Sequence, residues 1–140
     1  MPETAEEILA TGKADMVQMA RPLLADAFWV NKTATNRVDE INTCIACNQA
    51  CLDHAFKNKR VSCLVNPRAG HETELVYLKT KQPKRIAVVG GGVAGMSAAT
   101  VAASRGHAVT LFEATSDVGG QFNFAKVVPG KEEFHETIRY

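Results

Sequence analysis

A glycine-rich run, Gly90–Gly95, lies between an apolar segment rich in β-branched residues and a stretch with helical character. In this context the pattern GxGxxG is typical of the first turn of a βαβ unit that binds a dinucleotide. Gly90 would permit the tight turn, Gly92 would let the backbone approach a pyrophosphate, and Gly95 would let the helix pack closely on the strand. The run therefore predicts an α/β fold with a parallel sheet.

The flanking residues agree with this prediction. Arg85–Val89 predicts a strand, Val93–Arg105 a helix and Ala108–Glu113 a second strand. The N–H groups at the start of that helix are expected to attract phosphate. Glu113 ends the second strand, where a carboxylate accepts hydrogen bonds from the adenosine ribose and disfavours the 2′-phosphate of NADP. The alternative is a glycine-rich turn in some other α/β fold.

Four cysteines fall within a segment of twenty residues and have the spacing Cys-x2-Cys-x3-Cys-x11-Cys: Cys44, Cys47, Cys51 and Cys63. Thiolates are ligands for iron–sulfur clusters and for zinc. The short gaps let one loop reach three corners of a cubane, and the return segment supplies the fourth ligand. Four-cysteine zinc sites usually combine two Cys-x2-Cys pairs, which this spacing lacks. We expect a 4Fe–4S cluster, with zinc or unliganded thiols as the alternatives.

The composition excludes several classes of partner. The net charge is +1 with 22% charged residues, so no strong field favours nucleic acid or an anionic membrane. The N-terminus lacks the basic and apolar regions of a signal peptide. The apolar stretch Ile86–Ala103 is explained by the βαβ unit, and we expect no membrane span. Clustered cysteines in such a chain indicate a metal site in a reducing cytoplasm.

Shorter patterns in the sequence predict further helices and one further strand. The remaining predicted elements are helices over residues 3–11, 23–36, 49–56 and 134–140, and a strand over residues 15–20. Gly12 is expected to end the first helix. The cysteine segment, residues 43–67, is expected to be rich in loops, and residues 68–84 to be polar and extended.

Four motifs along nearly the whole chain carry a resemblance to a known family. They are Cys44-Ile-Ala-Cys47-Asn-Gln-Ala-Cys51, Ser62-Cys63-Leu-Val-Asn-Pro67, the Gly90 fingerprint and Asp117-Val-Gly-Gly-Gln121. Together they resemble the bacterial NADPH-dependent 2,4-dienoyl-CoA reductases and, more broadly, the iron–sulfur flavoenzymes that include trimethylamine dehydrogenase. The cysteine segment is highly specific for this group, whereas the fingerprint alone is not.

The resemblance implies three parts. Residues 1–36 would be the last strand and helices of an FMN-binding TIM barrel, and residues 37–82 the iron–sulfur segment and linker. Residues 83–140 would be the first βαβ unit of an incomplete Rossmann-like FAD domain. Electrons from NADPH would reach FMN by way of FAD and the cluster, for reduction of conjugated double bonds of an acyl-CoA in fatty acid metabolism. The FMN and NADPH sites would lie mainly outside this chain.

The resemblance also implies flavin-binding residues. Ala20 and Arg21 are similar to the segment whose backbone and arginine meet the FMN phosphate, and the alternative for Arg21 is a solvent-exposed loop arginine. Gly119, Gly120 and Gln121 are similar to the loop that lies along FAD, and the alternative is a plain turn. No catalytic residue is assigned, because the acid residues of the family lie in the rest of the barrel.

A complete (β/α)8 barrel needs roughly 250 residues, and no second fingerprint for NADPH is present. We therefore expect the chain to be the central junction of a longer enzyme, inactive alone, with the flavins and the rest of the parent enzyme as partners. Two other classes remain open. One is a zinc-stapled nucleotide-binding module without redox activity, and the other is a scaffold whose cysteines are merely buried.

Overall fold

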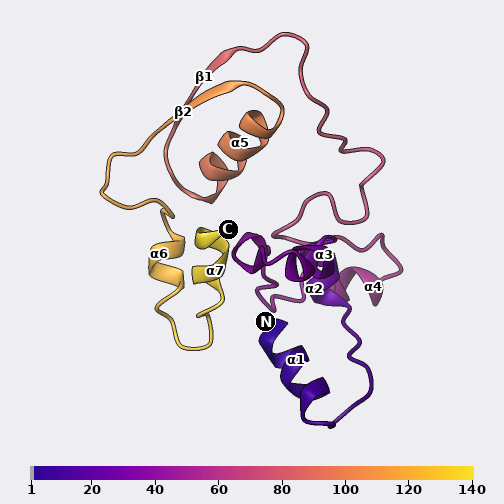
Figure 1. Cartoon of the computed structure of the whole chain (residues 1–140). Helices are drawn as coiled ribbons and strands as arrows, with labels where there is room; N and C mark the ends of the chain where they lie inside the picture. Colours follow the sequence, from indigo (N-terminus) through magenta and orange to yellow (C-terminus); the bar gives the residue numbers. More distant parts are fainter. Residues whose placement is uncertain (1) are drawn as a thin grey trace. The chain divides into compact units, whose positions relative to one another are not determined.

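The computed structural model describes residues 2–140, and the chain forms two compact units, residues 2–71 and Glu72–Arg139 (Figure 1). The first unit contains α1 (Pro2–Ala10), α2 (Arg21–Ala25), α3 (Trp29–Ala34), the 3-10 turn η1 (Val38–Glu40) and α4 (Leu52–Ala55). The second contains β1 (Arg85–Val89), α5 (Val93–Ser104), β2 (Ala108–Phe112), α6 (Phe122–Ala125) and α7 (Phe134–Arg139). Within residues 2–140, no helix has the length and apolar character needed to cross a bilayer.

The first unit is built mainly from loops and short helices around a small apolar core. Its buried apolar side chains are Ala25, Trp29, Ile41, Ile45 and Ala69. The predicted helix at residues 3–11 is confirmed by α1, and Gly12 follows it with a φ of 66°. A left-handed residue just beyond a helix is a common helix end, and glycine adopts this conformation without steric cost.

The prediction of one continuous helix over residues 23–36 is wrong. Helix α2 ends at Ala25 and α3 begins at Trp29. Between them, Oδ1 of Asp26 accepts a hydrogen bond of 2.9 Å from the backbone N–H of Phe28. An aspartate that bonds the backbone two residues later forms an Asx turn, which competes with helix continuation.

The prediction of a strand over residues 15–20 is also wrong in this structure. Among residues 2–140 the only paired strands are β1 and β2, and residues 15–20 take an irregular path. A parallel strand exists only when a neighbour accepts and donates its ladder hydrogen bonds, and in the described part of the chain no strand pairs with these residues. The described residues show no TIM barrel, and the barrel assignment of residues 1–36 stays a prediction.

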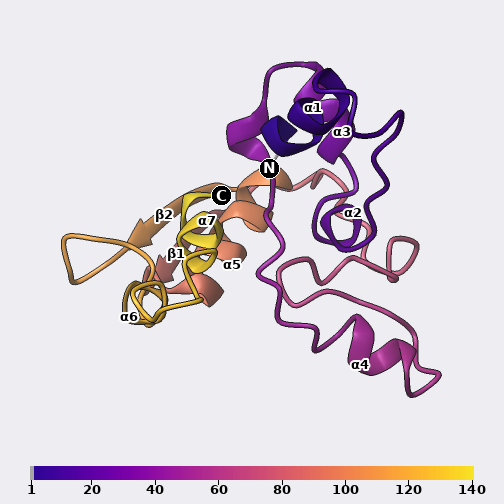
Figure 2. The same cartoon turned by 90° about the horizontal axis from the view of Figure 1, so that it is seen from below.

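The second unit confirms the βαβ prediction. Strands β1 and β2 are parallel, in register from Arg85 opposite Ala108 to Val89 opposite Phe112. Helix α5 connects them and packs on one face of the pair, as Figures 1 and 2 show. Side chains of both strands alternate between exposed and half-buried, as expected when one face of a sheet meets a helix.

The C-terminal part of the second unit is a helix pair. Phe122 of α6 stacks on Phe134 of α7 with ring centroids 4.8 Å apart, a spacing at which aromatic rings attract each other. Helix α7 confirms the helix predicted over residues 134–140, whereas α6 was not predicted. The three-part division at residues 36 and 82 stays a prediction.

Candidate functional site

All four cysteines line one cavity in the first unit. Its complete lining is Arg21, Leu24, Cys44, Ile45, Cys47, Asn48, Ala50, Cys51, Cys63 and Leu64. The enclosed volume between these side chains is small, about 10 Å³, and the cavity is partly open to solvent. The four thiols are free and each cysteine is half-buried. Residues that are distant in sequence therefore present four sulfur atoms to one space with apolar walls.

Backbone hydrogen bonds bring the fourth cysteine to the other three. The N–H of Ser62 donates to the carbonyl of Ala50 at 2.8 Å, so the return segment runs beside the cysteine loop next to Cys51 and Cys63. The N–H of Asp53 donates to the carbonyl of Asn48 at 3.1 Å and closes the turn that leads into α4. The gap of eleven residues before Cys63 is thus filled by α4 and a compact return.

Side-chain amides hold both ends of the cysteine segment. Nδ2 of Asn42 donates to the carbonyl of Val65 at 2.7 Å and joins the residues just before Cys44 to those just after Cys63. Nδ2 of Asn66 donates to the carbonyl of Leu24 at 2.9 Å. Buried amide hydrogen bonds of this kind fix a loop-rich segment that has few apolar contacts of its own.

The first cysteine pair is spaced by a left-handed residue. Ala46 has a φ of 52°, and Asn48, directly after Cys47, has a φ of 59°. The N–H of Ala46 points at Sγ of Cys44 with a nitrogen-to-sulfur distance of 3.4 Å. Left-handed residues turn successive N–H groups inward, an arrangement that favours anions and iron–sulfur clusters. Such a conformation costs an alanine about 1–2 kcal/mol.

Burial and hydrogen bonding act in opposite directions on the pKa of the Cys63 thiol. Burial raises the pKa of the Cys63 thiol, and the neighbouring Cys44 and Cys47 act in the same direction. The N–H groups of Val65 and Asn66 point at the same sulfur and lower its pKa in part. Without a bound cation, burial therefore disfavours the thiolate form of Cys63.

The thiols are not arranged around a single point. Within residues 2–140 no three His, Cys, Asp or Glu side chains are placed to hold one metal ion.

The second unit contains the glycine-rich loop. Gly90 has a φ of 102°, a conformation that L side chains rarely adopt. A Cβ on Gly95 would lie 1.9 Å from the carbonyl oxygen of Gly90, so α5 packs on the loop at a distance that only glycine allows. A Cβ on Gly92 would meet no atom within 4 Å. The backbone at Gly92 therefore faces open space at the start of α5.

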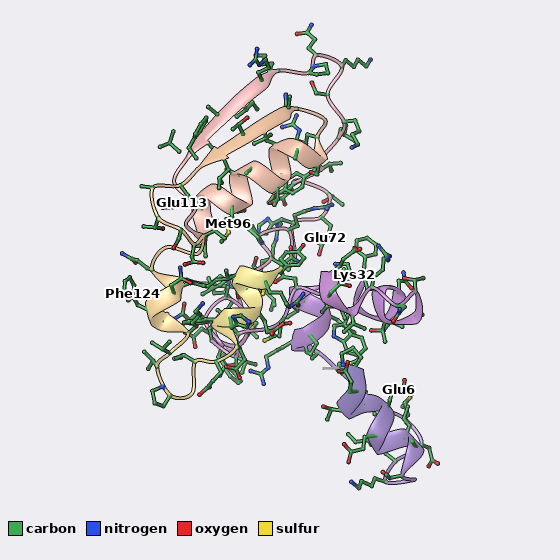
Figure 3. The ribbon with its side chains drawn as sticks, turned by 60° about the vertical axis from the view of Figure 1, so that its left-hand side comes forward. Glu6, Lys32, Glu72, Met96, Glu113 and Phe124 are labelled. Carbon is green, nitrogen blue, oxygen red and sulfur yellow. The ribbon has the colours of Figure 1, made fainter. Side chains whose placement is uncertain are left out.

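Glu113 is tied to this loop. Its Oε2 accepts a hydrogen bond of 2.6 Å from the N–H of Gly91, and its Oε1 accepts from the N–H and hydroxyl of Thr115, each at 3.0 Å. The N–H of Thr115, followed by that of Gly91 and the Thr115 hydroxyl, lowers the pKa of the Glu113 carboxyl. Figure 3 shows Glu113 beyond the end of β2, beside the first turn of α5 that carries Met96. The carboxylate is thus held ionised beside the helix start.

The loop after β2 returns to the same place. The N–H of Gly119 donates to the carbonyl of Gly91 at 2.7 Å, and a Cβ on Gly120 would lie 3.1 Å from Cα of Gly92. Gln121 precedes α6, and its carbonyl accepts from the N–H groups of Phe124 and Ala125. The structure therefore brings together the glycines at 90–92, Glu113, Gly119 and Gly120. Their role in cofactor binding stays a prediction.

The two residues expected near an FMN phosphate lie at the start of α2. Ala20 is exposed, and its carbonyl accepts from the N–H groups of Leu23 and Leu24, each at 3.2 Å. Arg21 lines the thiol cavity, and its Nη1 donates to Oδ1 of Asn48 at 2.5 Å. Asn48 was not predicted as a site residue. Its place directly after Cys47 was a usable signal, since residues between clustered ligands commonly face the site.

Comparisons with known proteins agree with the geometry of the second unit. Residues 88–138 match the family described as an NAD(P)-binding Rossmann-like domain. The chain is 50% identical over 139 residues to a metal reductase of Desulforamulus reducens, covering 99% of this chain and 21% of the relative. It is 48% identical over 134 residues to an NADH oxidase of Thermoanaerobacter brockii, covering 93% of this chain and 20% of the relative.

A solved 2-naphthoyl-CoA reductase in complex with 2-naphthoyl-CoA matches 100% of this chain and 22% of its own, with a TM-score of 0.96 and 38% identity. The proteins to which this chain is similar are oxidoreductases. The chain spans about one fifth of the length of the curated relatives it matches. A resemblance to the 2,4-dienoyl-CoA reductases in particular is not confirmed by these matches.

Proposed function

We propose that the chain is the electron-relay section of an iron–sulfur flavin oxidoreductase, in which electrons from NADPH reach FMN by way of FAD and a 4Fe–4S cluster. One observation carries this proposal: Cys44, Cys47, Cys51 and Cys63 line a single cavity. When bound, the cluster supplies one-electron storage between carriers. The residues of this chain would supply its ligands and its largely apolar surroundings.

The spacing of the four cysteines favours a cluster over zinc. Four-cysteine zinc sites usually combine two Cys-x2-Cys pairs, whereas here Cys51 follows the first pair closely and Cys63 stands alone. A cubane takes one thiolate at each of its four irons.

The protein atoms around the cavity suit an anionic guest. The side chains of Leu24, Ile45 and Leu64 give the cavity a largely apolar lining, of which Leu64 is 51% exposed. The N–H groups that point at the sulfur atoms of Cys44 and Cys63 stabilise thiolate charge. The same N–H groups would remain in place when the thiols ionise to bind iron.

The glycine-rich loop is proposed to hold the adenosine end of FAD. The open backbone at Gly92 leaves room for a pyrophosphate at the start of α5. The Glu113 carboxylate would accept hydrogen bonds from ribose hydroxyls after exchanging its bond to Gly91. Gly119 and Gly120, which pack on this loop, would lie along the flavin together with Gln121.

For the enzyme as a whole we propose reduction of a conjugated carbon–carbon double bond, of the enoate or dienoyl-CoA type. Two relatives support this substrate class: a cinnamate reductase of Clostridium sporogenes, 43% identical over 129 residues, and the 2-naphthoyl-CoA reductase. Both names describe unsaturated carbonyl compounds. Ala20 and Arg21 would meet the FMN phosphate, and the barrel residues that select the substrate would lie outside the chain.

The experiment that tests the proposal is anaerobic reconstitution with ferrous iron and sulfide, followed by one cycle of reduction by dithionite and reoxidation. We expect a brown protein whose visible absorption bleaches on reduction and returns on oxidation. Serine at any of the four cysteine positions should lower cluster uptake, whereas serine at the exposed Ala34 of α3 should not. A colourless wild-type protein after reconstitution would overturn the proposal.

A further inference from the structure

Arg21 is the only lysine or arginine among the described residues that line the thiol cavity. Its Nη1 donates a hydrogen bond of 2.5 Å to Oδ1 of Asn48, which lines the same cavity. The contact joins the first residue of α2 to the loop that carries three of the cysteines. The position of the positive charge is therefore set by the loop that also sets the positions of the thiols.

Asn48 is well suited to hold that charge. Its φ of 59° is a left-handed conformation, which asparagine adopts more readily than most residues. Its carbonyl accepts the N–H of Asp53 at 3.1 Å, so its backbone is part of the turn into α4. A glycine would satisfy the turn equally well, but it would offer no acceptor to Arg21.

We infer that Asn48 is a positioning residue that holds the Arg21 guanidinium at the cavity, where the positive charge raises the reduction potential of the bound cluster. The inference rests on the proposed function. Reduction by one electron makes a four-thiolate cluster more negative by one unit charge. A cation at the cavity stabilises the reduced form more than the oxidised form, because the reduced form carries one more negative charge.

This role is compatible with the predicted contact between Arg21 and an FMN phosphate. A guanidinium carries five N–H donors in a planar fork, and the contact with Asn48 uses one of its two terminal nitrogens. The other edge can meet an anion. One arginine would then connect the phosphate site and the cluster loop.

The test is a redox titration of the anaerobically reconstituted chain with dithionite, followed by electron paramagnetic resonance. Five variants are compared with the wild type: Asn48→Gly, Arg21→Gln, Arg21→Lys, the double variant of Asn48→Gly with Arg21→Gln, and Asn58→Gly as the control. Asn58 also has a left-handed backbone, with a φ of 51°, but does not line the cavity. Iron and sulfide content are measured for each protein before the titration.

We expect the midpoint potential to fall in Arg21→Gln, to fall by a smaller amount in Asn48→Gly, and to be unchanged in Asn58→Gly. The double variant should match Arg21→Gln, because Asn48 acts through Arg21 and the two effects are not additive. Arg21→Lys, which keeps the charge, should fall between wild type and Arg21→Gln.

Two results would overturn the inference while the proposed function stands. One is a cluster with normal iron and sulfide content whose potential is the same in Arg21→Gln as in the wild type. The other is an Asn48→Gly shift that persists in full when Arg21 is already glutamine. If Asn48→Gly fails to take up the cluster, the midpoint potential of Arg21→Gln alone tests whether the Arg21 charge raises the potential. A wild-type chain that takes up neither iron nor sulfide would instead refute the proposed function.

Discussion

The carboxylate of Asp26 accepts a hydrogen bond of 2.9 Å from the backbone N–H of Asn42, sixteen residues later in the chain. The same carboxylate accepts from Nζ of Lys32 at 2.6 Å and from the N–H of Phe28. Asn42 in turn bonds Val65, just beyond Cys63. A single buried carboxylate thus connects α2 and α3 to both ends of the cysteine segment.

Loss of this carboxylate charge is expected to destabilise the first unit. The side chains of Asp26 and Lys32 are 4% and 13% exposed, and breaking a buried pair by removing one partner costs about 3–5 kcal/mol. Asp26→Asn should therefore lower the free energy of unfolding by about that amount in a urea titration. Glu7→Gln, in the exposed pair with Lys13, should change it by less than about 1 kcal/mol. Equal effects of the two variants would contradict this assignment.

The left-handed backbone at Ala46 is expected to limit which residues allow cluster assembly. Ala46→Gly should retain full iron uptake, because glycine adopts a φ of 52° without steric cost. Ala46→Val should reduce uptake, because a β-branched residue is strained there by more than the 1–2 kcal/mol estimated for alanine, or roughly 2–3 kcal/mol. The measurement is iron per chain after reconstitution, with Ala34→Val in α3 as the control. Full loading of the Ala46→Val protein would show that this conformation is not required.

Glu113 is expected to make the second unit sensitive to acid. The N–H groups of Thr115 and Gly91 lower the pKa of its carboxyl in the folded state. The resulting stabilisation is present above the unfolded pKa, about 4.3, and is lost as the pH falls through the folded pKa. In urea titrations, the difference between wild type and Glu113→Gln should therefore be larger at pH 7 than at pH 3. A difference that does not change with pH would contradict this role for the carboxylate.

Two glycines of the fingerprint should respond differently to alanine. Gly95→Ala places Cβ 1.9 Å from the carbonyl oxygen of Gly90 and should cost about 1–3 kcal/mol of stability. Gly92→Ala meets no atom within 4 Å and should leave the melting temperature nearly unchanged. Its added methyl group should nevertheless weaken ADP-ribose binding by about tenfold or more, because the pyrophosphate approaches the backbone there. Unchanged ADP-ribose affinity in Gly92→Ala, measured by calorimetry, would argue against a dinucleotide at this loop.

The second unit was largely predictable because its determinants are local. Strand β1 was predicted with the bounds that the structure shows, and α5 and β2 were each predicted one residue too long. Alternating β-branched residues, a glycine turn and a helical pattern of small residues act within a few positions of each other. The bond between Glu113 and Gly91 follows from the parallel register of the two strands, which the βαβ pattern already implies.

The first unit was less predictable because its structure depends on contacts between residues that are far apart in the sequence. Residues 15–20 have the apolar character of a strand but find no ladder partner among residues 2–140. The break between α2 and α3 depends on Asp26, whose side chain also serves Asn42 and Lys32. The spacing of the cysteines predicted that they share a site. The hydrogen bond between Asn42 and Val65 has no signature in the sequence.

Elemental analysis tests most directly whether the four thiols of the first unit bind one 4Fe–4S cluster. Iron, acid-labile sulfide and zinc are measured in the anaerobically purified and reconstituted chain, beside the Cys63→Ser variant. We expect about four irons and four sulfides per wild-type chain, with little zinc. In the Cys63→Ser variant the iron and the sulfide content should both fall markedly. One zinc per chain without sulfide, or iron content that is the same in Cys63→Ser as in wild type, would contradict it.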